Sequence, residues 1–116
     1  MRIPNDRRVT FFIDIDRTIV DDRGIPFPGA VECIKKLSEK ANVYIWSAGG
    51  FYYANAITEK IGLIDHVCGT IPKPDYTVDD LHVDLDFSQS IYPDWEFLEN
   101  LEKRLRGKFV NDKDLL

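Results

Sequence analysis

Two aspartates separated by a single residue follow directly on an apolar segment near the N-terminus. The segment is residues 9–13, and Asp14 and Asp16 come after it with Ile15 between them. Because side chains alternate sides along an extended strand, both carboxylates are expected to point the same way. Two ionised carboxylates this close repel each other, and a divalent cation that prefers oxygen ligands, such as Mg²⁺, is the usual means of holding them together. The alternative is an ordinary acidic turn, since Asp is common in turns.

Three further polar groups follow apolar segments later in the chain: Ser47, Lys73 and the acidic pair Asp79–Asp80. A serine after a strand is usually a turn or helix-cap residue, and a lysine between two prolines is usually solvated. A second acidic pair, Asp84 and Asp86, competes with Asp79–Asp80 for any role in metal binding. No single one of these groups indicates a functional site, and only their order along the chain suggests one.

Alternating strands and helices are expected to position these residues. We expect short strands at residues 9–13 and 43–46, a third strand leading up to residue 70, a fourth at residues 76–78 and an edge strand at residues 108–110. Helices are expected from about residue 30 to 40–42, from 51 to 61 and from 93 to 105. The second helix should end at Gly62, and its aromatic residues are expected to lie in the core. This alternation predicts an α/β, three-layer Rossmann-like fold, with a mostly parallel central sheet and helices on both faces. Ligands of such folds bind at the carboxyl ends of strands, where the polar groups would converge.

Length and composition indicate one ordinary globular domain. The chain has 116 residues, 44% hydrophobic and 30% charged, so residues 1–116 are expected to form a single domain with residues 1–8 as a flexible lead-in. The net charge of -5 argues against non-specific nucleic-acid binding through a basic surface. No segment reaches the roughly 20 apolar residues needed to span a bilayer, and the N-terminus lacks a signal-peptide core. A cytoplasmic protein is therefore expected.

The ordered set of polar groups resembles the four motifs of the haloacid dehalogenase-like superfamily of phosphohydrolases. The first motif of that family is an apolar strand followed by Asp-x-Asp-x-Thr, which Asp14-Ile15-Asp16-Arg17-Thr18 matches. Ser47 matches the second motif, Lys73 the third, and Asp79–Asp80 the fourth. The matches extend from residue 9 to residue 80, so the resemblance covers most of the chain and implies the fold of that family.

The resemblance implies a Mg²⁺-dependent phosphatase. Asp14 would be the nucleophile that becomes a phospho-aspartate, Asp16 the general acid and base, and Lys73 the cation that offsets charge during transfer. Ser47 and its neighbour Ala48 would bind the phosphate together with Thr18, which steadies the loop rather than reacting. Mg²⁺ would be held by Asp14, the main-chain carbonyl of Asp16 and a carboxylate of the fourth motif, with Asp80 preferred over Asp79. Asp84 and Asp86 remain alternatives for that last ligand.

The chain departs from the family pattern at three points. Arg17 stands where many relatives carry glycine, and it would either tune substrate choice or decorate the surface. Lys73 lies so close to Asp79–Asp80 that no helix fits between them. The gaps between motifs also leave no room for a cap domain, so the site would be open. An open site suits a bulky phosphorylated substrate, such as a phosphoprotein or a nucleic-acid end, or a lid supplied by another subunit.

Other functions share parts of this pattern. Response-regulator receivers also combine acids, a hydroxyl and a lysine around Mg²⁺, but their acid pair is on the first strand and their phosphorylated Asp on a later one. A catalytically silent phosphate-binding domain of the same fold is a further alternative. Phosphotransferase or phosphonate-cleaving chemistry would begin with the same covalent step.

Overall fold

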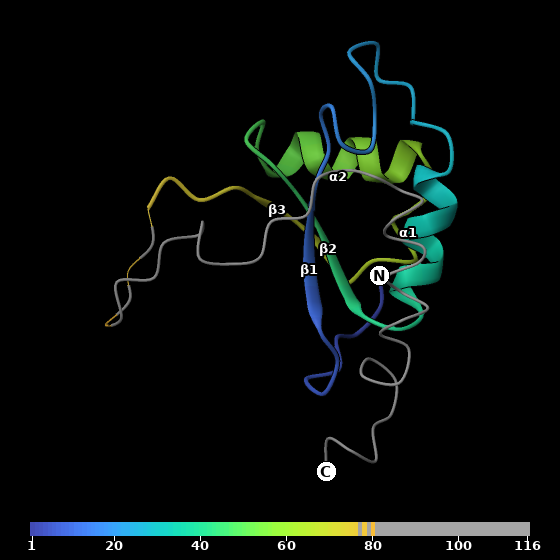
Figure 1. The fold of residues 1–116 in the computed structure, drawn as a ribbon. Helices are drawn as coiled ribbons and strands as arrows, with labels where there is room; N and C mark the ends of the chain where they lie inside the picture. Colours follow the sequence, from blue (N-terminus) through green and yellow to red (C-terminus); the bar gives the residue numbers. More distant parts are fainter. Residues whose placement is uncertain (77, 79, 81–116) are drawn as a thin grey trace.

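A computed structural model describes residues 1–76, 78 and 80. Its elements are β1 (Thr10–Asp14), α1 (Ala30–Ser38), β2 (Asn42–Ser47), α2 (Phe51–Lys60) and β3 (Gly69–Pro72) (Figure 1). The order of strands and helices predicted up to this point is confirmed, with α1 ending slightly earlier and β3 beginning later than expected. The predicted strand at residues 76–78 contains the undescribed residue 77, and the elements predicted after residue 80 lie outside the described residues.

The three strands form one parallel sheet in the order β1-β2-β3. In its register Ile13 is opposite Ile45, and Asp14 is opposite Trp46. Parallel neighbours need a crossover connection, and α1 and α2 lie in the two crossovers. The described part of the chain is therefore an α/β unit, and its arrangement is compatible with a Rossmann-like fold.

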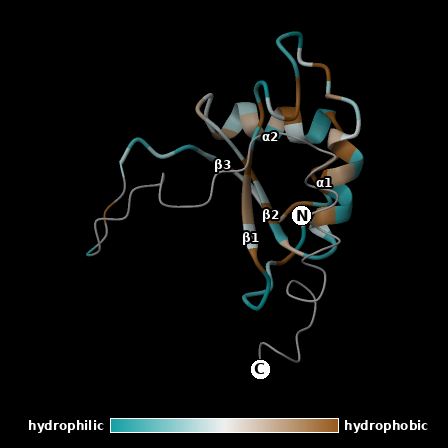
Figure 2. Ribbon diagram, viewed as in Figure 1, coloured by the Kyte–Doolittle hydropathy of each residue, from teal (hydrophilic) through white to brown (hydrophobic). Residues whose placement is uncertain are grey.

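Both helices cover the same face of the sheet. Ile13, Val43 and Ile45 occupy alternate strand positions and form one core cluster. The helix residues in that cluster come from α1 (Ala30, Ile34, Leu37) and α2 (Ala54). This placement follows from the strand order, because successive right-handed crossovers between neighbouring parallel strands lie on one side of a sheet. Figure 2 shows hydrophobic residues running along the strands and hydrophilic ones in the turn before β1.

The opposite face of the sheet carries aromatic side chains. The Phe12 side chain is 47% exposed, and its ring lies 5.5 Å from that of Tyr44 and 5.1 Å from that of Trp46, measured between centroids. Neither of the two described helices packs on this face. The second helical layer that was predicted from the sequence is thus not among the described residues.

The helices are short, and the end of α2 follows the sequence signal. Gly62 has a φ of 80° and its N–H donates to the Glu59 carbonyl, while the Leu63 N–H donates to the Thr58 carbonyl. These two bonds form a Schellman motif, which favours glycine at the left-handed position. The predicted end of this helix at Gly62 is confirmed. In the part of the chain that the structure describes, no helix is long and apolar enough to cross a membrane.

The N-terminal lead-in is hydrogen-bonded to the body of the domain. The Arg2 N–H donates to the Val67 carbonyl over 2.8 Å, and the Arg8 guanidinium donates to the Glu39 carbonyl. The Asn42 side chain, at the start of β2, accepts from the Asn5 N–H and donates to the Asn5 carbonyl. These contacts fasten the segment to the amino-terminal end of the sheet, which is the end away from Asp14.

Candidate functional site

The carboxyl ends of the three strands form a common edge. β1 ends at Asp14 and β2 at Ser47, and the register places Ser47 opposite Pro72 at the end of β3. Lys73 follows immediately, and its backbone N–H donates to the Ser47 carbonyl over 2.9 Å. The hydrogen bonding between β2 and β3 therefore extends to Lys73 and holds its backbone in place.

Lys73 and Asp14 form an ion pair at this edge. Lys73 Nζ lies 3.3 Å from Asp14 Oδ1, and the two side chains are 36% and 33% exposed. The same ammonium lies 5.5 Å from the centroid of the Trp46 ring. Lys73 is thus placed both by a carboxylate and by the electron-rich face of an aromatic ring, a combination that favours a cation.

Asp16 lies beside Asp14 and has its own partner. The Tyr53 hydroxyl donates to Asp16 Oδ1 over 2.6 Å. This hydrogen bond raises the pKa of the Tyr53 phenol above its ordinary value of 10.0, and burial and the charges of Asp16 and Asp14 raise it further. The side chains of Asp14 and Asp16 are half-buried, whereas Ile15 between them is buried, in agreement with the expected alternation.

A tight turn follows Asp14 and fixes the first motif. The Ile15 carbonyl accepts from the backbone N–H groups of Thr18, Ile19 and Val20 over 3.1, 2.9 and 3.2 Å. The Thr18 backbone thereby belongs to the turn next to Asp16, where its side chain is half-buried. This placement agrees with a role in steadying the loop.

Arg17 adopts a left-handed backbone conformation within this turn, with a φ of 59°. That conformation costs most residues roughly 1–2 kcal/mol, and glycine adopts it without this cost. Glycine would therefore suit this position of the turn better than arginine does. The Arg17 side chain is exposed, and its guanidinium lies 3.9 Å from Asp22 Oδ1.

Ser47 is buried at the end of β2. Its hydroxyl oxygen accepts from the Gly49 N–H over 2.9 Å, and its side chain is only 1% exposed. Ala48 is exposed in the turn that connects β2 to α2. A Cβ added at Gly49 would lie 2.9 Å from Tyr53 Cδ2 and 3.2 Å from Ser47 Oγ, so this turn requires a residue without a side chain.

The aromatic residues of α2 correct one prediction. They were expected in the core, but Phe51 and Tyr52 are exposed and Tyr53 is 36% exposed. The buried residues of the helix are Ala54 and Thr58, whose small side chains allow the helix to approach the sheet closely. Three consecutive residues cannot share one face of a helix, and the polar tip of tyrosine is a further signal that Tyr53 could serve the site rather than the core.

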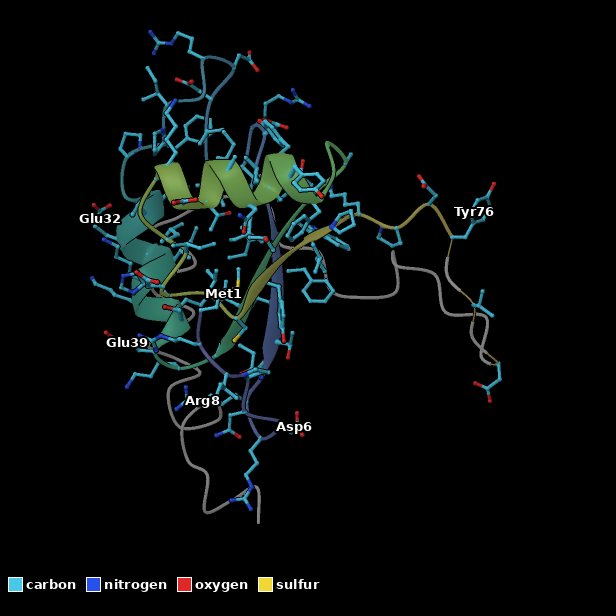
Figure 3. All side chains as sticks on the ribbon, turned by 180° about the vertical axis from the view of Figure 1, so that it is seen from behind. Met1, Asp6, Arg8, Glu32, Glu39 and Tyr76 are labelled. Carbon is cyan, nitrogen blue, oxygen red and sulfur yellow. The ribbon has the colours of Figure 1, made fainter. Side chains whose placement is uncertain are left out.

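Asp80, the described member of the acidic pair after β3, is not brought to this edge. Asp80 is exposed, and the segment after Lys73 runs away from the sheet (Figure 1), so that Tyr76 projects well beyond it (Figure 3). Asp79, Asp84 and Asp86 lie outside the described residues. The described residues contain no group of three or more His, Cys, Asp or Glu side chains that could hold a metal. The identity of the last metal ligand therefore stays a prediction.

The donors that the described edge does supply have the chemistry that suits Mg²⁺. The Asp14 carboxylate and the Asp16 main-chain carbonyl are hard oxygen donors, and Mg²⁺ commonly binds to one or two carboxylates and keeps several waters. A cation would also relieve the repulsion between the carboxylates of Asp14 and Asp16, which lie near the same phenol. In chemical type, these two donors fit the metal that the sequence predicts.

A comparison of the chain with protein-family models, curated proteins and solved structures finds no match. The interpretation of this edge therefore depends on its own geometry. From Asp14 to Lys73, a range that is described throughout, the chain forms only α1, β2, α2, β3 and the loops between them. Within that range there is no additional domain that could cover the paired side chains.

Proposed function

We propose that this protein is a Mg²⁺-dependent phosphomonoester hydrolase of the haloacid dehalogenase-like type, acting through a phospho-aspartate on Asp14. The observation that carries the proposal is the ion pair between Lys73 Nζ and Asp14 Oδ1, 3.3 Å apart. It joins the first and third motifs of the sequence pattern at a single strand edge. Ser47, from the second motif, adjoins it through the backbone bond to Lys73.

In the first step, an Asp14 carboxylate oxygen attacks phosphorus. A bond forms between that oxygen and phosphorus while the ester bond to the leaving oxygen breaks, and Asp16 donates a proton to the leaving oxygen. Lys73 orients the attacking carboxylate and offsets the negative charge that gathers on the phosphoryl group. The Ser47 hydroxyl accepts from Gly49 and keeps its own proton for a phosphoryl oxygen.

In the second step, a water molecule attacks phosphorus and gives a proton to Asp16. The bond between Asp14 and phosphorus breaks, inorganic phosphate leaves, and the Asp14 carboxylate is restored. Asp16 finishes the cycle in the protonation state in which it began. It therefore has to stay within hydrogen-bond reach of both oxygens, the leaving one and the attacking one.

Asp14 and the main-chain carbonyl of Asp16 would hold the Mg²⁺, and the sequence assigns the last ligand to Asp80 or Asp79, although the structure does not bring Asp80 to this edge. When bound, the metal supplies positive charge that lowers the repulsion between the carboxylates and the phosphate dianion. Asp84 and Asp86 are the alternative source of the last carboxylate.

The fold that belongs to this proposal is a three-layer one. The aromatic face formed by Phe12, Tyr44 and Trp46 is half-exposed, and a second helical layer would cover it. The sequence offers a candidate for that layer in residues 93–105, where Trp95, Leu98, Leu101 and Leu105 recur at helical spacing.

The proposal is tested by hydrolysis of p-nitrophenyl phosphate with and without Mg²⁺. We expect Mg²⁺-dependent hydrolysis that is lost in Asp14→Asn and retained in Asp22→Asn, which alters an exposed acid of the neighbouring loop. Mass spectrometry after acid quenching should find an acyl phosphate on Asp14. Equal rates in the parent protein and Asp14→Asn would remove Asp14 from the mechanism and leave a phosphate-binding domain without turnover as the alternative.

A further inference from the structure

Tyr53 is the residue of α2 that contacts the candidate site directly. It lies in the first turn of the helix, and its hydroxyl crosses to Asp16 Oδ1, 2.6 Å away, in the turn that follows β1. This distance lies well within the range for a hydroxyl donating to a carboxyl oxygen. The contact joins two segments that the sheet does not pair.

One side of the Tyr53 ring packs against the turn that follows β2. It lies against the backbone of Gly49, where an added Cβ would be 2.9 Å from Cδ2 and 3.2 Å from Cγ. The ring is therefore packed against a turn that Ser47 also fixes through its hydrogen bond from Gly49. A packed ring with a single hydroxyl at its tip directs that hydroxyl to one place.

Asp16 needs such a partner because it lies beyond the regular part of the sheet. β1 ends at Asp14, and Asp16 is connected to the structure by an isolated bridge to Val20. Lys73 contacts Asp14 and so does not serve as the partner of Asp16. Each of the two carboxylates thus has one partner from another segment, a cation for Asp14 and a neutral phenol for Asp16.

We propose that Tyr53 is a positioning residue that holds the Asp16 carboxylate in place for proton transfer to the leaving oxygen. This inference rests on the proposed function, in which Asp16 is the general acid. A general acid must remain within hydrogen-bond distance of the atom it protonates, and a carboxylate fixed by a second group meets that demand better than a free one. In this role Tyr53 acts through Asp16 and is not itself a catalytic residue.

The experiment compares two phosphate esters that differ in their need for an acid. A nitrophenolate departs without protonation, whereas the alkoxide of glycerol does not. Tyr53→Phe removes the hydroxyl and keeps the ring, so the packing against Gly49 is preserved. We expect kcat/KM for β-glycerol phosphate to fall about tenfold, and kcat/KM for p-nitrophenyl phosphate to change by less than about twofold. The tenfold loss is smaller than the roughly 10²–10⁴-fold that a general acid contributes, because Asp16 itself is still present. The ratio kcat/KM is used because it reports the step in which the ester bond breaks.

The matched control is Tyr52→Phe, which removes a hydroxyl from the adjacent residue, whose side chain is 86% exposed. It should leave both values of kcat/KM unchanged. An equal loss for both esters in Tyr53→Phe, or the same pattern in Tyr52→Phe, would overturn the positioning role while leaving the proposed function intact. Absence of hydrolysis in the parent protein would overturn the proposed function and this inference with it.

A second measurement needs neither metal nor turnover. In the metal-free protein, the urea midpoints of Tyr53→Phe, Asp16→Ala and the double variant form a cycle that isolates the hydrogen bond between the two side chains. We expect the shifts of the single variants to be non-additive in the double variant. Additive shifts would mean that Tyr53 and Asp16 are not coupled in solution, and this would overturn the inference whatever the activity data show.

Discussion

Lys73 reaches Asp14 across the middle strand of the sheet, with Nζ 3.3 Å from Oδ1. The strand order is β1-β2-β3, so the residue that ends β1 and the residue that follows β3 belong to strands that do not pair. Trp46 of β2 lies between them, and its ring lies 5.5 Å from the Lys73 ammonium. The contact between the two charges is therefore supported by the central strand.

Replacing Lys73 by Met removes the charge and keeps a side chain of similar length. Without the cation, hydrolysis should fall about 10²–10³-fold, the range found when one group that stabilises transferred charge is lost. The free energy of unfolding should change by less than about 1 kcal/mol, because both partners are partly exposed and solvent weakens their attraction. Steady-state rates and urea unfolding measure the two effects. Unchanged hydrolysis in Lys73→Met would remove Lys73 from the mechanism, and Lys73→Arg, which keeps a cation, should retain more activity.

Trp46→Leu should weaken the positioning of the Lys73 ammonium and leave its charge unchanged. A cation over an exposed aromatic face gains about 0.5–1 kcal/mol, so the loss of the ring should lower kcat by a factor of about 2–5. Tyr44→Leu is the matched control, since Tyr44 also contacts Phe12 on the same face but has no contact with Lys73 among those described. If both variants lowered kcat equally, the effect would come from the aromatic face as a whole rather than from the support of Lys73.

Arg17→Gly should be more stable than Arg17→Ala by about 1 kcal/mol. Both variants remove the guanidinium, but only glycine adopts the left-handed conformation without steric cost. Denaturant unfolding of the two variants measures the difference directly. At Arg23, which is not among the described residues with positive φ, the order should reverse, because glycine there would only add freedom to the unfolded chain. The same order at both positions would contradict the strained turn.

The Tyr53 phenol should titrate above its ordinary value of 10.0 in the metal-free protein. The hydrogen bond to Asp16 needs the protonated phenol, so its contribution to stability is complete below the pKa of the unfolded chain. That contribution is lost as the pH rises through the higher pKa of the folded protein. The difference in tyrosinate absorbance between the parent protein and Tyr53→Phe measures the midpoint. In Asp16→Ala the midpoint should move back toward 10.0, and a midpoint insensitive to this change would contradict the contact.

Phosphorylated peptides or oligonucleotides should be better substrates than small sugar phosphates. Between Asp14 and Lys73 no additional domain encloses the edge, and the side chains of Ala48 and Phe51 are exposed in and beside the turn that follows Ser47. A large substrate can bury such side chains, whereas a small sugar phosphate cannot. Values of kcat/KM for a phosphopeptide, a phosphorylated oligonucleotide and a hexose phosphate make the comparison. Efficient turnover of the hexose phosphate alone would contradict an open site suited to macromolecules.

Much of the fold could be predicted because local sequence signals mark where its strands and helices begin and end. Three such signals are the apolar run before Asp14, the glycines before Phe51, and Gly62 after α2. Each depends only on residues close to it in the sequence, and the elements lie where these residues indicate. The meeting of Asp14 with Lys73 was also accessible, because it follows from parallel strands whose ends share an edge.

The partners of the charged groups could not be predicted in the same way. The sequence predicts Tyr53 in the core and Trp46 in a strand. Their partners, however, depend on how closely α2 approaches the sheet and on which face of β2 is covered. Small residues such as Ala54 determine how closely α2 approaches the sheet. The side on which the crossovers lie determines which face of β2 is covered. Both are tertiary properties that periodicity along a single segment does not contain.

The strand order also bears on how this chain could assemble during synthesis. Each strand pairs with the one made just before it, so every new piece of sheet can add to an edge that already exists. A nascent chain that has emerged from the ribosome as far as residue 73 would hold both members of the pair of opposite charges. This ion pair can therefore begin to form while translation of the remaining residues continues.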